Sequence, residues 1–154
     1  MTTDYMAEAL DLARRGIGLA SPNPMVGAVV VRDGEVAGRG FHTWAGVKHA
    51  EVLALEEAGE RARGATLFVT LEPCAHQGRT GPCAEAVVGA GIARVVAASE
   101  DPNPRVSGLG FQRLRQAGVE VALDQAHAGE ALKLNEPFVH FMRTGRPLVF
   151  LKAA

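Results

Sequence analysis

The chain has 154 residues, and 47% of them are hydrophobic, which predicts one domain with a single core. The net charge of −1 argues against a nucleic-acid-binding surface. Charged side chains between Met1 and Arg15 argue against a signal peptide, and the longest uncharged stretch, residues 16–31, contains two prolines and is too short to cross a bilayer. We therefore expect a cytoplasmic protein that binds neither nucleic acid nor a membrane.

The first half of the chain predicts two helices on either side of a hairpin. Apolar residues recur at helical spacing over residues 4–17 and again over residues 49–60. Two prolines within residues 21–24 predict a loop. The Asp33-Gly34 turn then joins two expected strands, residues 26–32 and 35–40.

The second half alternates strands with helices. The apolar patterns predict strands over residues 66–71, 94–99 and 119–123, and helices over residues 82–90, 109–117 and 130–142. This order after an initial hairpin is typical of an α/β fold, a three-layer α/β/α sandwich with a mixed sheet. Residues 147–152 predict a further strand at the end of the chain. We therefore expect one domain over residues 1–146, followed by a terminal strand in residues 147–154.

Three residues have the chemistry of a catalytic zinc site. His49 opens a predicted helix, while Cys74 and Cys83 flank a loop between a strand and the next helix. One imidazole and two thiolates suit a tetrahedral zinc ion that keeps one position open for water. Pro82 fits the first helical position, which places Cys83 in the opening turn, where the helix dipole favours a thiolate.

Glu51 lies two residues after His49 and is the candidate general acid/base. From there it can take a proton from water and pass it to a leaving amine without binding the metal. An HxE sequence followed by PCxxC marks the zinc nucleobase deaminases. In this chain eight residues, 75–82, separate the two cysteines instead of two.

That long cysteine loop is part of a wider resemblance. The motifs that carry it are residues 70–83, TLEPCAHQGRTGPC, together with PNPMVG at 22–27, GFH at 40–42, HAEV at 49–52, DPNP at 101–104 and LNEPF at 134–138. In this order and over nearly the whole chain, the sequence resembles the deaminase domain of the bifunctional deaminase/reductases of riboflavin biosynthesis. The resemblance implies a cytidine-deaminase-like fold. It also implies that residues 147–154 are the stub of a reductase domain that this chain lacks.

The implied reaction is the zinc-dependent, hydrolytic removal of an amino group from diaminohydroxyphosphoribosylaminopyrimidine. The partner of the site is then a small phosphoribosyl-pyrimidine. The substrate contacts that carry over from the family are Asn23, His42, His76, Arg79, Thr80, Asp101 and Asn103. Physically, the Arg79 guanidinium is the best candidate to bind the phosphate, with the Thr80 hydroxyl beside it. Relatives of this fold commonly associate, so we expect a homo-oligomer, as a dimer.

Two alternatives stay open at this stage. The same chemistry could serve another substrate, such as a nucleoside, a free base or transfer RNA. The metal could instead be structural, in an interaction module whose terminal strand docks a partner. That reading needs a fourth protein ligand, and His76 is the nearby candidate.

Overall fold

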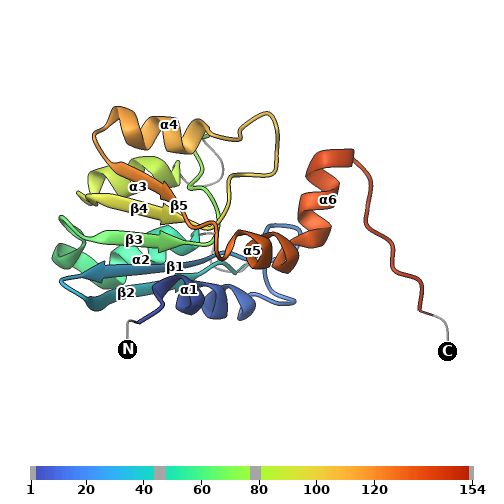
Figure 1. Ribbon diagram of the computed structural model, residues 1–154, viewed down its shortest axis with the longest axis horizontal. Coiled ribbons are helices and arrows are strands. Elements are labelled where there is room, and N and C mark those ends of the chain that lie inside the picture. The colour runs from blue at the N-terminus through green and yellow to red at the C-terminus, as the bar shows by residue number, and fades with distance from the viewer. Residues whose placement is uncertain (1–2, 44–47, 77–80, 153–154) are drawn as a thin grey trace.

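The computed structural model describes residues 3–43, 48–76 and 81–152 (Figure 1). Its centre is a five-stranded sheet with the order β2-β1-β3-β4-β5. The strands are β1 (Gly27–Arg32), β2 (Glu35–Phe41), β3 (Thr66–Val69), β4 (Arg94–Ala97) and β5 (Glu120–Leu123). β1 pairs antiparallel with β2 and β3, whereas β3, β4 and β5 run parallel, so the sheet is mixed as expected.

Helices cover both faces of this sheet. They are α1 (Tyr5–Arg14), α2 (Ala50–Ala58), α3 (Cys83–Gly89), α4 (Leu109–Gln116) and α5 (Ala128–Leu134). A short 3-10 helix, η2 (Gly59–Ala62), follows α2, and α6 (Glu136–Thr144) lies beyond the end of the sheet (Figure 1). Ala28 and Val30 of β1 belong to a core formed with α2, α3 and α4. Val29 and Val31 face the opposite way, toward α1 and α5. This alternation divides the core in two and confirms the three-layer sandwich.

Small residues let α2 lie close against the sheet. A Cβ atom at Gly38 would collide with the carbonyl oxygen of Ala54, and one at Gly40 would collide with that of Ala50. Only glycine leaves room for the helix backbone at these two positions of β2. The close approach fixes the start of α2, where the HxE sequence lies.

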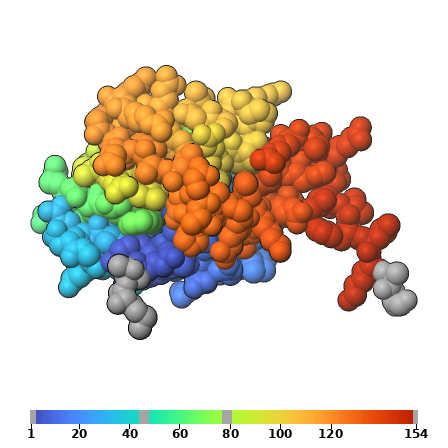
Figure 2. Space-filling model, viewed as in Figure 1, coloured from blue at the N-terminus to red at the C-terminus, as the bar shows by residue number. Residues whose placement is uncertain are grey.

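The expected strand over residues 147–152 is wrong, since these residues form no regular structure. A strand needs a hydrogen-bonding neighbour, and this segment extends away from the body of the molecule beyond α6 (Figure 2). The expected helix over residues 130–142 is interrupted at Asn135, which separates α5 from α6. Within the described residues, no helix is long and apolar enough to cross a membrane.

Candidate functional site

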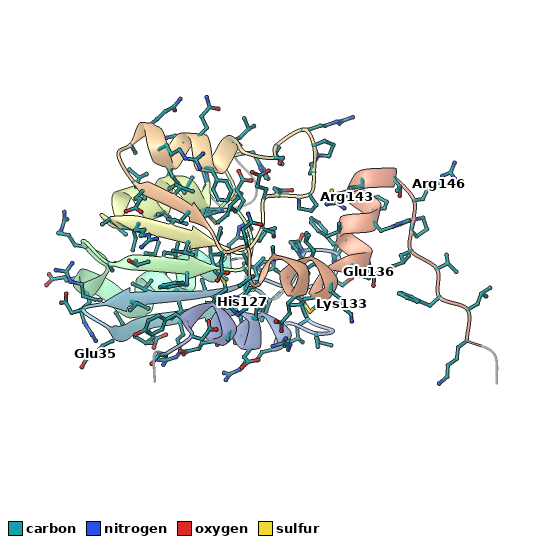
Figure 3. The ribbon with its side chains drawn as sticks, viewed as in Figure 1. Glu35, His127, Lys133, Glu136, Arg143 and Arg146 are labelled. Carbon is teal, nitrogen blue, oxygen red and sulfur yellow. The ribbon has the colours of Figure 1, made fainter. Side chains whose placement is uncertain are left out.

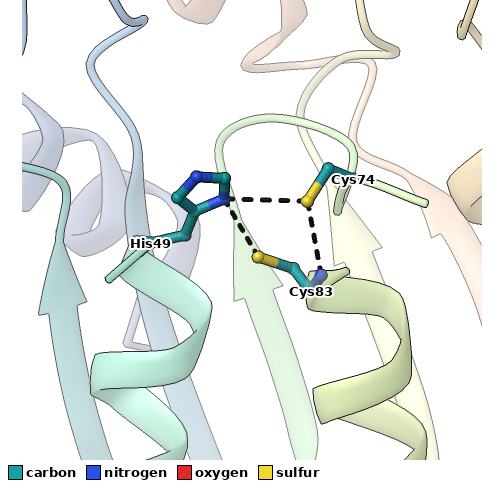
Figure 4. A group of neighbouring side chains, drawn as sticks. All are labelled: His49, Cys74 and Cys83. Atoms are coloured by element: carbon teal, nitrogen blue, oxygen red, sulfur yellow. Dashed lines mark hydrogen bonds between the residues drawn. The ribbon is translucent and has the colours of Figure 1, made fainter. Parts of the chain in front are cut away.

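His49, Cys74 and Cys83 lie together where three structural elements meet (Figure 4). The His49 Nδ1 atom is 3.1 Å from the Cys83 sulfur and 3.7 Å from the Cys74 sulfur. The backbone N–H of Cys83 donates to the Cys74 sulfur at 3.3 Å. All three candidate ligand atoms lie within 4.8 Å of one another, which is close enough for a single metal ion.

The fold brings these ligands together at the carboxyl ends of the strands. His49 immediately precedes α2, and Cys83 is the first residue of α3. Cys74 follows β3, and its carbonyl oxygen accepts from the Ala84 N–H at 3.0 Å, which ties the loop to the first turn of α3. Two helices therefore begin at the cluster, and their positive dipole ends favour thiolates there.

The donor set fits zinc better than it fits a hard cation. One imidazole nitrogen and two thiol sulfurs are ligands that zinc accepts, and both cysteines are free of disulfides. The nearby Cys83 thiol lowers the pKa of Cys74 to about 4, whereas the Cys74 sulfur, together with burial, raises the pKa of the Cys83 thiol. The hydrogen bond with Cys74 raises the pKa of His49. The surroundings of Cys74 therefore favour its thiolate form.

Glu51 is a buried carboxyl beside this cluster. Its side chain is 3% exposed, and burial raises its pKa to about 7. It lies beside the Cys83 side chain and lines the same cavity as His49 and Cys74. A carboxyl in this position can hold or release a proton close to the open side of the ligand cluster.

The cluster opens into a cavity of about 510 Å³, large enough for a small molecule. His49 and Cys74 line this cavity. Six more of the expected site residues line it as well: Asn23, His42, Glu51, His76, Asp101 and Asn103. The other wall residues were not expected from the sequence, namely Pro22, Pro24, Val26, Leu71, Glu72, Val106, Phe138 and Met142.

His42 and Asn23 form a hydrogen-bonded pair on one wall. The Nδ1 atom of His42 is 3.2 Å from the carbonyl oxygen of Lys48, so this nitrogen donates and carries the proton. Its Nε2 atom then accepts from the Asn23 side-chain amide at 3.2 Å. Burial lowers the pKa of His42, which favours the neutral ring. The pair is therefore held in one orientation, with polar groups on the cavity wall.

Asp101 and Asn103 also line the cavity, and their side chains shape their own loop. The Asp101 carboxylate accepts from the Asn103 N–H at 2.8 Å, and the Asn103 side chain accepts from the Arg105 N–H at 3.1 Å. These are Asx-type turns, which the proline-rich sequence favours. Burial raises the pKa of Asp101. The two side chains thus line the cavity while fixing the loop that carries them.

The structure describes only one of the three remaining expected substrate contacts, His76. Arg79 and Thr80 lie outside the described residues, so the phosphate site stays a prediction. His76 is exposed at the cavity and does not belong to the ligand cluster found among the described residues. Phe138 and Met142 come from α6, whose approach to the cavity is a tertiary contact that no local motif encodes. The LNEPF motif marked this segment without assigning it a role.

Comparison with known proteins agrees with this geometry. Residues 1–99 match the family described as the cytidine and deoxycytidylate deaminase zinc-binding region. The riboflavin biosynthesis protein RibD of Escherichia coli is 55% identical over 96% of this chain, and that of Aquifex aeolicus is 52% identical over 98%. The chain spans about two fifths of the length of these relatives.

Solved structures give the same result. RibD of Acinetobacter baumannii has a TM-score of 0.89 at 53% identity, covering 93% of this chain and 40% of that one. The diaminohydroxyphosphoribosylaminopyrimidine deaminase/reductase of Thermotoga maritima has a TM-score of 0.86 at 45% identity, covering 93% and 41%. A deaminase of the transfer RNA wobble position has a TM-score of 0.65 at 30% identity, covering 84% and 97%. The resemblance drawn from the motifs is confirmed, and so is the cytidine-deaminase-like fold.

Proposed function

Because the chain belongs to the cytidine and deoxycytidylate deaminase zinc-binding family, we propose that it deaminates diaminohydroxyphosphoribosylaminopyrimidine hydrolytically and releases ammonia. The observation that carries this proposal is the buried carboxyl of Glu51 beside a His/Cys/Cys cluster, at a cavity of small-molecule size. High identity to RibD proteins supports the riboflavin-pathway substrate over other pyrimidines.

The cofactor in this proposal is zinc, held by His49, Cys74 and Cys83. When bound, zinc lowers the pKa of water and so makes a nucleophile available near neutral pH. Glu51 accepts the proton of the attacking water and returns it to the departing amine. Its burial keeps that proton away from bulk solvent between the two transfers.

The cavity walls orient the pyrimidine in this scheme. The Asn23 side-chain amide hydrogen-bonds the polar edge of the base through its oxygen and its second N–H, and His42, whose two ring nitrogens bond Lys48 and Asn23, holds that amide in place. Phe138 and Met142 offer an apolar surface to the ring. Asp101, Asn103 and His76 line the same cavity and contact the rest of the substrate, and Arg79 with Thr80 binds the phosphate.

A substrate panel tests this function. Zinc-loaded protein is incubated with the diaminopyrimidine ribotide, cytidine, deoxycytidylate, guanine and transfer RNA, and released ammonia is measured. Turnover of the ribotide alone is the expected result. Turnover of transfer RNA in its place would favour the second candidate, which the wobble-position deaminase structure suggests and the net charge of −1 argues against.

Three further expectations belong to this proposal. We expect the protein to be cytoplasmic and to form a homodimer. We also expect the domain boundary to lie between residues 146 and 147. Phe150 and Leu151 beyond that boundary are 73% and 97% exposed, which is unusual for large apolar side chains and supports a covering partner. Light scattering after size-exclusion chromatography measures the oligomeric state, and a monomeric mass would exclude the dimer.

A further inference from the structure

Glu72 is a buried carboxylate with no part in the mechanism above. It follows β3 and lies two residues before Cys74, and it is 4% exposed. One oxygen, Oε1, accepts from the N–H groups of Gly110 at 2.8 Å and Phe111 at 3.3 Å. The other, Oε2, accepts from those of Asp101 at 3.0 Å and Gly108 at 2.9 Å. Four backbone amides from two segments therefore converge on one side chain.

Both carboxylate oxygens are committed to these backbone groups. Within residues 3–43, 48–76 and 81–152, no Lys, Arg or His forms an ion pair with Glu72. Burying a carboxylate without a cation is costly, and hydrogen bonds from backbone amides are what offsets that cost. The geometry suits a structural anchor and leaves little capacity for proton transfer.

Glu72 binds both ends of the loop formed by residues 101–108, called the Asp101 loop. Asp101 begins the loop and Gly108 closes it, while Gly110 and Phe111 belong to the first turn of α4. Inside the loop, the N–H groups of Val106 and Ser107 donate to the Asn103 carbonyl at 3.0 and 2.9 Å, in addition to the two Asx-type turns. The loop is thus internally braced and is tied to the rest of the protein through Glu72.

Glu72 and the start of α4 are also fixed relative to the segment that carries Cys74. The backbone N–H of Glu72 donates to the Ser99 carbonyl at 2.9 Å, which fixes the residue to the end of β4. A Cβ atom at Gly110 would collide with the carbonyl oxygen of Pro73, so the start of α4 presses against the residue before Cys74. Glu72 therefore holds the cavity wall that carries Asp101 and Asn103 at a fixed separation from Cys74.

We propose that Glu72 is a positioning residue of the cavity: its four backbone hydrogen bonds place the wall formed by Asp101, Asn103 and Val106 for substrate binding. This inference rests on the proposed function, because the wall is assigned to the substrate. Glu72 lines the cavity, but both of its oxygens accept backbone N–H groups, so it acts on the substrate through the wall that it holds. Its loss should therefore weaken substrate binding far more than it slows the bound reaction.

The test compares Glu72→Gln with two controls. An amide in place of the carboxylate puts an NH₂ group against two backbone N–H donors in either orientation. We expect KM for the ribotide to rise about tenfold or more, with kcat within about threefold of wild type and zinc content unchanged. Amide hydrogen exchange measured by NMR should accelerate at Asp101, Gly108, Gly110 and Phe111. Glu72→Asp, which keeps the charge, should give a smaller rise in KM.

The controls separate positioning from stability and from charge. Leu114→Ala removes a fully buried side chain from α4 and lowers the unfolding midpoint, yet should leave KM near wild type. Glu100→Gln removes an exposed charge next to the same loop, where it contacts the Ser107 hydroxyl, and should also leave KM near wild type. If Leu114→Ala raises KM as much as Glu72→Gln does, the role of Glu72 is only structural and the inference is overturned.

The exchange measurement keeps this test separate from the proposed function. A wild-type protein that releases no ammonia from the ribotide refutes the proposed function. The exchange rates of the four amides still decide the Glu72 inference in that case. Unchanged exchange at these amides in Glu72→Gln overturns it, and Glu72→Asp supplies the same readout if the Gln variant does not fold.

Discussion

Replacing Glu51 with Gln tests the chemical role of this residue. Gln has nearly the same shape, so the buried site beside Cys83 stays filled and the zinc ligands are untouched. The other carboxylates on the cavity wall, Glu72 and Asp101, both accept backbone N–H groups and are poorly placed to take over proton transfer. Loss of a general acid/base costs about 10²- to 10⁴-fold in rate, and without a substitute we expect the upper end, about 5 kcal/mol of barrier.

The assay measures ammonia release from the ribotide and zinc content by atomic absorption on the same samples. Glu56→Gln is the matched control, because Glu56 lies on the same helix but is exposed and paired with Lys48 at the surface. It should keep wild-type turnover. A Glu51→Gln protein with zinc bound and more than about a tenth of wild-type kcat would refute the role given to Glu51.

Three further perturbations probe the rest of the account. His76→Ala should keep full zinc stoichiometry, because His76 lies outside the ligand cluster, and loss of metal would revive the structural-zinc alternative. Gly40→Ala should lower the free energy of unfolding in urea by about 1–3 kcal/mol, because the new methyl group collides with the Ala50 carbonyl; an unchanged midpoint would contradict the close packing of α2. His127 lies between β5 and α5 (Figure 3). It donates a hydrogen bond to the Asp124 carboxylate, and this bond raises the pKa of His127. The bond stabilises the folded protein by about 1 kcal/mol or less below the unfolded pKa of 6.5, and this stabilisation is lost as the pH rises through the raised pKa of the folded state. In His127→Gln, the free energy of unfolding in urea should therefore depend less on pH across that range.

The local part of the site was predictable because its signals are local. His49 and Glu51 are two residues apart, and Cys83 follows a proline at a helix start, so residue type and spacing alone point to the residues that the structure brings together in the cluster and to the carboxyl beside it. The hairpin follows from the Asp33-Gly34 turn for the same reason. These features need no knowledge of distant segments.

Other features depend on contacts between segments far apart in the sequence. Asn135 interrupts the expected last helix and uses its side chain to bond both the N–H and the carbonyl of Met25, 110 residues away. The resulting α6 brings Phe138 to the cavity. Glu72 gains its role only because Gly110 allows α4 to approach Pro73. The apolar run near Phe150 has the composition of a strand, but it has no neighbouring strand in the described chain to complete it.

The most direct measurement of the central claim follows the oxygen that replaces the amino group. Zinc-loaded protein is incubated with the diaminopyrimidine ribotide in water labelled with heavy oxygen, and the product is examined by mass spectrometry while ammonia is quantified. Hydrolytic deamination predicts one labelled oxygen in the product for each ammonia released. Ammonia without label in the product, or an unaltered ribotide, would contradict the account.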